Sequence, residues 1–563
     1  GWYILRDWSE TDFDRNTLLE NLHVRYGVSP FFKISVEPNP NMPGHNSIRI
    51  SPSGLGLPDR KYYYMDEDDR IQTAYKQYIR DVIIDLNNAA NEATKFGTDM
   101  FSYEKRIAEV TPDRNTLQNP IHTYNAVSLS ELKLTNMINF YDILQAMYPD
   151  SNITEHTEVI VTSLDYIHKI AQIIGTTDSR TLNGYLIWTL VHKYIPYLSD
   201  KYTSPLDSFN NDLYGIKEPQ QRWEMCSRLV RNVMGLAVDN YLEKTNPVSE
   251  ESVRVVNNTF GFIVDVVKKR INKFENTALL YKHLQFKLST LELQIGVPKQ
   301  ARNETFMKTY YLGLRIIKSN LFETVRNGIY FQKKIEEKKL SNSAIDETVM
   351  SHALADVPKV VYSPSDHKIV VPRNLLMEPV FEHNFPNPVI YGRLGVELAE
   401  AVVSSVLPYN SLWTANKKIL SPSHMTVDES IRAVQSPIKC LADVISNKHS
   451  TVPEQVVNET SLRALIHLSA VSVAQEALHL SLENKEHIHQ PSLEGYEDPA
   501  LFFMSYAQTQ CSESTSQHKL YEEVINFQLP QKSLLHLAWT QISEFSESLE
   551  CSVAEDLLCR DIF

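Results

Sequence analysis

Residues 75–86, YKQYIRDVIIDL, carry the pattern that decides the fold class. Their apolar side chains recur every three or four residues, the spacing of one buried face of an α-helix; they are Tyr75, Tyr78, Ile79, Val82, Ile83 and Leu86. Comparable spacing runs through residues 163–174, 223–242, 253–274, 309–329 and 463–482. Because the chain also has only 17 glycines in 563 residues, the sequence predicts a mainly α-helical protein.

Strand-like segments are scarce and short. The best candidates are residues 31–36, 47–50, 360–362 and 368–371. The last two are separated by Ser363-Pro364-Ser365-Asp366, residue types that favour a tight turn. This pair of segments predicts a β-hairpin in the C-terminal part of the chain.

The length of the chain predicts at least two domains, because a single hydrophobic core stops growing at roughly 250 to 300 residues. Residues 333–347 are polar and include Glu336-Glu337-Lys338-Lys339, which indicates a connector with a solvated, mixed-charge surface. We place the boundary near residue 345, between an N-terminal unit of residues 1–345 and a C-terminal unit of residues 346–563.

Composition and charge narrow the possible functions. Hydrophobic residues make up 42% of the chain and charged residues 22%, as is typical of a folded globular protein. The net charge is -14 and the Lys and Arg residues are dispersed, so nucleic acid is a poor candidate partner. No run of about 18 apolar residues occurs, and we expect no membrane span within this chain.

The cysteines favour disulfides and four asparagines lie in glycosylation triplets, although such triplets alone are a weak signal because they often arise by chance. The five cysteines show no Cys-x-x-Cys spacing, which leaves a zinc knuckle or a thioredoxin-like motif unsupported, and their concentration toward the C-terminus favours disulfides. Asn-x-Thr triplets predict surface N-glycosylation at Asn152, Asn257, Asn303 and Asn458.

Short motifs over essentially the whole chain resemble, in order and approximate spacing, those of the neprilysin and endothelin-converting-enzyme family of zinc peptidases. The most specific is Gly54-Leu55-Gly56-Leu57-Pro58 followed by Tyr62-Tyr63, directly after the strand-like residues 46–50. The others are Leu293-Gln294-Ile295-Gly296-Val297-Pro298, Ile369-Val370-Val371-Pro372, Tyr391-Gly392-Arg393-Leu394-Gly395, Leu501-Phe502-Phe503 with Ala507-Gln508 and Cys511, and the ending Cys559-Arg560-Asp561-Ile562-Phe563. The resemblance implies two helical lobes around a central cavity, with a small β-hairpin and the zinc site in a thermolysin-like C-terminal lobe.

The residues that should bind zinc are replaced. Active members carry His-Glu-x-x-His on a helix, so that two histidines one turn apart bind zinc and the glutamate takes a proton from the bound water. Counting from Tyr391 places the first His on Glu400, the glutamate on Ala401 and the second His on Ser404. None of the 18 histidines is followed by Glu, so the motif occurs nowhere in this sequence.

The remaining positions of the resembled site also differ. The third zinc ligand matches Ile466 or His467, and its supporting Asp matches Ala470 or Val471. The transition-state His and the Arg beyond it fall on Gln528 and Leu534, while Lys359 and Val360 replace an Asn-Ala pair that binds peptide backbone. Only Tyr362 and Arg560 are retained. We therefore expect no zinc and no catalytic residues, with Glu400 and His467 forming a polar pair instead of a metal site.

Other candidate sites have simpler interpretations. Glu486, His487 and His489 predict a polar loop, and His479 with Glu483 an exposed helix face, because neither group shows supporting residues for a metal. No Gly-x-Ser-x-Gly elbow and no phosphate-binding loop are present. Cys226 as a thiol nucleophile is a weaker interpretation than a disulfide or a buried thiol.

The resemblance also implies how the cysteines pair. Cys440 matches a family cysteine that bonds to the equivalent of Cys559. Cys226, Cys511 and Cys551 match cysteines whose partners lie upstream of this chain, so we expect a longer gene product with a disulfide-linked upstream segment.

These observations favour a non-catalytic extracellular protein, secreted or tethered by an upstream anchor. It would bind a protein or peptide ligand, or serve as a structural component of an extracellular assembly. The alternative is an active metallopeptidase with a relocated metal site.

Overall fold

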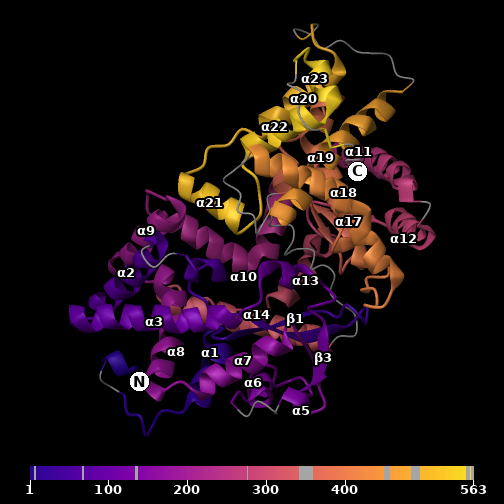
Figure 1. The fold of residues 1–563 in the computed structure, drawn as a ribbon. Helices are drawn as coiled ribbons and strands as arrows, with labels where there is room; N and C mark the ends of the chain where they lie inside the picture. Colours follow the sequence, from indigo (N-terminus) through magenta and orange to yellow (C-terminus); the bar gives the residue numbers. More distant parts are fainter. Residues whose placement is uncertain are drawn as a thin grey trace. The chain divides into compact units, whose positions relative to one another are not determined.

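A computed structural model describes residues 1–5, 8–65, 69–132, 137–274, 277–341, 359–448, 457–483, 493, 495–552 and 558–559. The described chain is mainly α-helical with two small sheets (Figure 1), as the sequence predicts. It divides into two compact units: unit 1 contains Gly1–Gly235 and Tyr310–Ile345, and unit 2 contains Leu236–Thr309 and Asp346–Phe563.

Unit 1 combines helices with a four-stranded sheet of order β1-β2-β4-β3, in which β1 and β2 are antiparallel, β2 and β4 parallel, and β3 and β4 antiparallel. Its elements are η1(Tyr3–Leu5), α1(Arg15–Arg25), β1(Phe32–Pro38), β2(Asn46–Pro52), η2(Arg60–Tyr63), α2(Arg70–Asp85), α3(Ala90–Val110), α4(Arg114–Gln118), β3(Asn125–Ser128), α5(Leu129–Leu132), α6(Phe140–Met147), β4(Glu158–Val161), α7(Leu164–Gly175), α8(Ser179–Tyr194), η4(Ile195–Tyr197), α9(Asp200–Tyr214) and α14(Leu321–Ser341). Helix α10(Arg222–Thr245) begins in this unit and ends in unit 2.

Unit 2 contains a three-stranded sheet of order β5-β7-β6, which includes the predicted hairpin. β6 and β7 are antiparallel, with Tyr362 opposite Ile369, and β5 runs parallel to β7. The elements are α11(Glu250–Arg270), η5(Ile271–Phe274), α12(Ala278–Ser289), β5(Glu292–Ile295), η6(Lys299–Arg302), α13(Glu304–Tyr310), β6(Val361–Ser363), β7(Lys368–Val371), η7(Arg373–Leu375), α16(Asn387–Ile390), the π-helical turn η8(Tyr391–Gly395), α17(Val396–Val406), η9(Asn410–Leu412), α18(Met425–Lys448), α19(Val457–Leu482), α20(Asp498–Thr509), α21(Ser516–Val524), α22(Gln531–Gln541) and α23(Ser543–Ser548).

The predicted division at residue 345 is wrong for residues 236–309, which belong to unit 2. Helix α11 buries Val256, Ile263 and Val267 in the same hydrophobic cluster as α17 and α19, so this segment packs with the C-terminal half of the chain. The change of unit falls one residue after Met234, where the backbone of α10 is non-helical.

The predicted connector at 333–347 is also helical as far as Ser341, and its remaining residues lie outside the described part of the chain. Lys333 pairs with Glu336 and Lys334 with Glu337 one turn on, at 2.9 and 2.7 Å. Glu337 is buried instead of solvated, because it accepts hydrogen bonds from the backbone N–H groups of Asp150 and Ser151.

The helix predicted over residues 309–329 is only partly present. Helix α13 ends at Tyr310 and α14 begins at Leu321. Between them Gly313 adopts a φ of +98°, in the left-handed region that ends a helix, and the chain continues in turns.

The Gly54-Leu55-Gly56-Leu57 segment of unit 1 is held by a buried carboxylate. Glu104 of α3 accepts hydrogen bonds from the hydroxyls of Tyr63 and Tyr75, at 2.6 and 3.0 Å, and from the backbone N–H of Gly56 at 3.2 Å. Burial raises the pKa of Glu104 to about 7, although these three donors oppose the shift.

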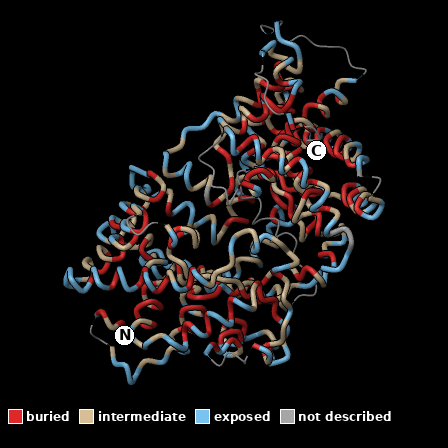
Figure 2. The backbone as a smooth tube through the Cα atoms, viewed as in Figure 1, coloured by how far each residue is buried: buried red, intermediate tan, exposed pale blue. Residues whose placement is uncertain are grey.

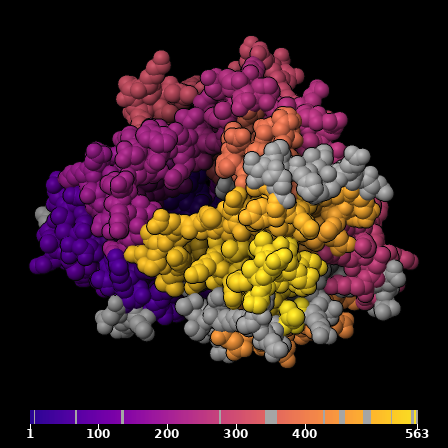
Figure 3. Space-filling view, turned by 90° about the horizontal axis from the view of Figure 1, so that it is seen from above, coloured from indigo at the N-terminus to yellow at the C-terminus, as the bar shows by residue number. Residues whose placement is uncertain are grey.

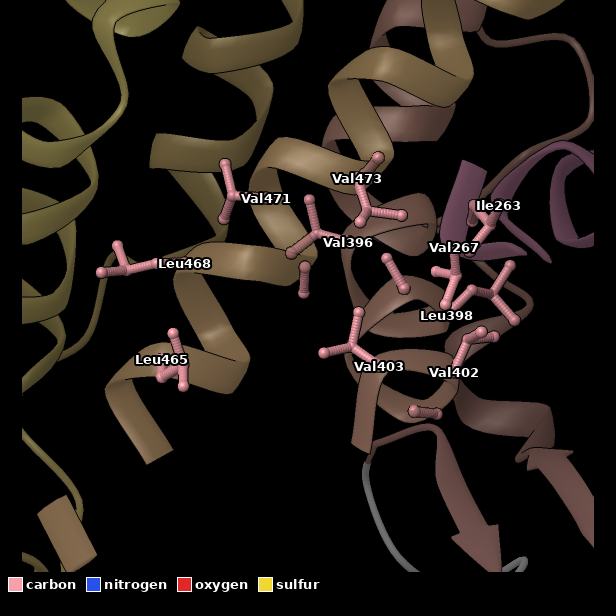
Figure 4. Close-up of a cluster of buried hydrophobic side chains, with 14 of the residues drawn as sticks. Ile263, Val267, Val396, Leu398, Val402, Val403, Leu465, Leu468, Val471 and Val473 are labelled. Atoms are coloured by element: carbon pink, nitrogen blue, oxygen red, sulfur yellow. The ribbon is translucent and has the colours of Figure 1, made fainter. Parts of the chain in front are cut away.

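The core of unit 2 is built around α17 and α19. Figure 2 shows buried residues, in red, along both helices, and the close-up in Figure 4 shows side chains from α11, α17 and α19 in one cluster. α17 and α19 bury residues on more than one side, so the polar residues that interrupt them lie next to a hydrophobic core.

Candidate functional site

Close packing against α20 fixes the position of the turn that precedes the N-terminus of α17. A Cβ at Gly392, in the π-helical turn η8, would lie 2.5 Å from the carbonyl oxygen of Phe502 on α20. Only glycine permits this approach. The turn therefore sets the direction in which α17 carries Glu400, Ala401 and Ser404.

The three positions of the resembled His-Glu-x-x-His motif have different surroundings. The side chain of Glu400 is 35% exposed, whereas Ala401 is buried and has no group that could act as a base. Ser404 is used structurally, because the side-chain amide of Asn410 donates to both its carbonyl oxygen and its hydroxyl, each at 3.0 Å. The position of the second histidine thus helps to close the C-terminal end of α17.

Of the two candidate positions Ile466 and His467, it is His467 of α19 whose side chain contacts Glu400. Its Nδ1 lies 3.1 Å from Oε2 of Glu400 and its Nε2 lies 2.8 Å from the hydroxyl of Tyr506 on α20. An ionised carboxylate only accepts hydrogen bonds, so Nδ1 is the donor to Glu400, and Nε2 shares the second hydrogen bond with the hydroxyl of Tyr506. Both ring nitrogens are therefore engaged by protein groups.

Electrostatics keep this chain of three residues together. Burial raises the pKa of Glu400, but the hydrogen bond from His467 and the positive charges of His467, Lys359 and Arg463 outweigh it and lower the pKa below its usual value. The neighbouring carboxyl of Glu397 behaves in the opposite way, because burial and the charge of Glu400 raise its pKa to about 7. The surroundings thus favour the ionised form of Glu400, which accepts the hydrogen bond from His467, and the protonated form of Glu397.

The surrounding positions are apolar. Ala470 and Val471 of α19 are both fully buried, so whichever matches the supporting Asp has no polar group to orient a ligand. Leu534 of α22 joins the same hydrophobic cluster, and Gln528 is half-buried before α22. Neither offers the charged donor implied at its position by the resemblance.

The hairpin edge is tied to the interior of unit 2. Val360 is buried beside β6, and the backbone N–H of Val360 is bonded to the carboxyl of Glu397. The buried hydroxyl of Tyr362 lies 3.1 Å from Nδ1 of His367. Burial raises the pKa of the Tyr362 hydroxyl. Tyr362 is thus retained as a packing residue, while Arg560 lies outside the described residues.

A buried lysine that sequence patterns alone did not single out joins these elements. Lys287 of α12 is fully buried and donates to the carbonyl oxygens of Asn410 and Trp413, at 2.5 and 2.9 Å. Its amine also lies 5.2 Å from the ring centre of Tyr362. Burial lowers the pKa of Lys287 to about 7. The available signal was its place in the apolar stripe Leu280, Leu284, Leu288.

The other proposed clusters do not form a metal site in the described structure. His479 of α19 and Glu483, directly after the end of α19, are both exposed, as expected, and Glu486, His487 and His489 lie outside the described residues. Within the described ranges, no group of three or more His, Cys, Asp or Glu side chains could hold a metal ion. The donors that surround Glu400 do not fit zinc, which needs three or four converging ligands.

The disulfide between Cys440 of α18 and Cys559 is present, as the resemblance implied. Cys226, Cys511 and Cys551 carry exposed thiols; Figure 3 shows the yellow C-terminal part of the chain, which holds the last two, on the molecular surface. The four asparagines of the Asn-x-Thr triplets are also exposed.

The helix pair α17 and α19, with the hairpin beside α17, supplies the elements around which the resemblance places the zinc site of active members. Two family profiles, both described as Peptidase family M13, match residues 1–298 and 360–560 respectively. The chain belongs to peptidase family M13.

Individual relatives extend over nearly the whole chain. Human endothelin-converting enzyme 1 is 23% identical over 571 residues, covering 98% of this chain and 71% of that protein. The fold is similar to a crystal structure of the Mycobacterium tuberculosis zinc metalloprotease Zmp1 with an inhibitor, at a TM-score of 0.84 and 16% identity over 100% of this chain and 84% of the other. A chain of the Haemonchus galactose-containing glycoprotein complex matches at a TM-score of 0.73 and 14% identity, covering 97% and 82%.

No helix in the described part of the chain combines the length and apolar character needed to cross a bilayer.

Proposed function

We propose that this chain is a non-catalytic, zinc-free member of peptidase family M13 that acts outside the cell by binding a protein or peptide, or as a structural component of an assembly. The observation that carries the proposal is the hydrogen-bonded chain Glu400–His467–Tyr506 at the place where the family holds zinc. It uses both nitrogens of the one histidine available there.

Loss of activity follows from the chemistry of hydrolysis. A bound zinc lowers the pKa of its water to about 7, and a general base contributes about 10²- to 10⁴-fold to the rate. With Ala401 at the position of the base and Ser404 bonded to Asn410, neither contribution has a residue to supply it.

Binding through the outer surface is favoured over capture of a peptide in a substrate-like way. Lys359 and the buried Val360 stand where the family presents an Asn-Ala pair to peptide backbone. The Haemonchus glycoprotein complex contains a chain of this fold, which supports an assembly as one form of that binding.

The test compares the natural chain with one in which the site is rebuilt by Glu400→His, Ala401→Glu, Ser404→His and His467→Glu. Both are given zinc and a mixture of peptides, and cleavage is followed by mass spectrometry. We expect intact peptides with the natural chain. Near-ultraviolet circular dichroism establishes whether the rebuilt chain is folded, and any cleavage by a folded rebuilt chain serves as a positive control.

Chelator-sensitive cleavage by the natural chain would overturn the proposal and favour the alternative, an active peptidase with a relocated metal. Displaceable, tight binding of short peptides that is lost on Lys359→Ala would instead show that capture at the old substrate site is retained.

A further inference from the structure

The turn segment of residues 312–320 in unit 1, here called the 312–320 loop, exposes an unusual set of aliphatic side chains. Leu312 is 77% exposed, more than any other large hydrophobic residue in the described structure, and Ile316 and Ile317 are 58% and 41% exposed. Exposed apolar residues are common singly, but three within six residues form a local apolar surface.

This exposure is built into the loop by its hydrogen bonds. The hydroxyl of Thr324 accepts from the backbone N–H of Ile317 at 2.9 Å and donates to the carbonyl of the same residue at 3.0 Å. The side chain of Asn320 caps α14 by accepting from Glu323 N–H at 3.0 Å. The loop therefore has a defined conformation that holds its aliphatic side chains outward.

Aromatic packing anchors the start of the loop. Tyr311 stacks on the buried Phe331 of α14, with ring centres 5.8 Å apart, and Tyr310 meets the same ring edge-on at 6.1 Å. The next residue, Leu312, then points away from this packing and remains exposed. A fixed base with an exposed aliphatic tip is suited to contact with another surface.

The charge of the loop is opposite to that of the protein. Arg315 and Lys318 are exposed between the aliphatic residues, and no Asp or Glu occurs from residue 305 to residue 322, although the chain has a net charge of -14. The loop thus presents aliphatic and cationic groups alternately, with no carboxylate of its own.

We propose that the 312–320 loop docks on the surface of a phospholipid bilayer that contains anionic lipid. Leu312, Ile316 and Ile317 enter the boundary between headgroups and acyl chains, and Arg315 and Lys318 pair with lipid phosphates while their stems lie along the apolar layer.

A lipid surface fits the loop better than a protein partner does. The exposed tip lacks the Trp and Tyr side chains that dominate protein interfaces. The backbone groups of Ile317 are already bonded to Thr324, so they are not available for strand addition and carry no penalty in an apolar layer.

Co-sedimentation of the whole chain with vesicles tests the proposal. Vesicles of phosphatidylcholine with phosphatidylserine are compared with vesicles of phosphatidylcholine alone, at low and high salt. We expect binding that is stronger with phosphatidylserine and weaker at high salt. Arg315→Gln with Lys318→Gln should weaken it by about 30-fold, from roughly 1 kcal/mol for each charge near an anionic surface.

The apolar contribution has its own variant and matched control. Ile316→Ser should reduce binding about tenfold or more, whereas Met42→Ser, which removes a side chain of similar exposure elsewhere in unit 1, should not. Unchanged melting temperatures are expected for all variants, because the altered side chains are exposed. Absence of vesicle binding, or equal vesicle binding by Ile316→Ser and the natural chain, would overturn the proposal. So would a result in which the loop variants lose binding to a soluble protein but not to vesicles. None of these results depends on whether the chain binds zinc.

Discussion

Removal of the Cys440–Cys559 disulfide should cost unit 2 a large part of its stability. The bond joins residues 119 positions apart, from α18 to the end of the described chain. In the chain-entropy treatment, a closed loop of this length limits the unfolded state enough to contribute about 5 kcal/mol. We therefore expect the double variant Cys440→Ala and Cys559→Ala to unfold about 5 kcal/mol more easily than the natural chain.

Urea unfolding, followed by tryptophan fluorescence without reductant, measures this difference. Cys226→Ala is the matched control, because its thiol is exposed and forms no disulfide within the described chain. Cys559 has a second anchor, since its backbone N–H donates to the side chain of Gln541 at 2.9 Å. If the double variant lost less than about 1 kcal/mol of unfolding free energy, the entropic argument would be refuted. Contacts such as the hydrogen bond to Gln541 would then hold the chain end without the disulfide.

Three further outcomes follow from hydrogen bonds at two sites and from the exposed glycosylation triplets. Asn410→Ala removes both donors to Ser404 and should lower the unfolding free energy by about 1 to 2 kcal/mol in urea, with its far-ultraviolet spectrum unchanged. The raised pKa of Glu104 contributes stability that is fully present below pH 4.5 and is lost as pH rises through about 7. Between pH 5 and pH 8, the unfolding free energy of Glu104→Gln should therefore rise by about 3 kcal/mol relative to that of the natural chain. Parallel profiles of unfolding free energy against pH for the two proteins would exclude this. Protein from secreting eukaryotic cells should lose mass on treatment with an N-glycosidase, and Asn152→Gln or Asn303→Gln should each reduce that loss by one glycan if its site is occupied.

Local periodicity predicted much of the fold. The stripe from Tyr75 to Leu86 lies almost entirely within α2, and the hairpin turn, at residues 364–367, lies between β6 and β7 as expected. These elements are determined by side chains close in sequence, which is the information that periodicity carries.

Interactions between distant segments could not be predicted in the same way. Residues 236–309 show the helical spacing expected of them, but only the packing of α11 on α17 and α19 assigns them to unit 2. Gly313 ends the expected helix through its own left-handed backbone.

The same limit applies to the site. The sequence located Glu400 and His467 as remaining polar residues, but not the third member Tyr506, which meets them from α20. It also missed that Lys287 holds the loop after α17, because burial of a lysine depends on carbonyl groups more than 100 residues away.

The zinc content of the protein tests the central claim most directly. The whole chain is produced by secretion from eukaryotic cells with zinc in the medium, desalted, and measured by elemental analysis alongside the chain rebuilt at Glu400, Ala401, Ser404 and His467. We expect far less than one zinc per natural chain. About one zinc for each natural chain, retained through desalting, would contradict it.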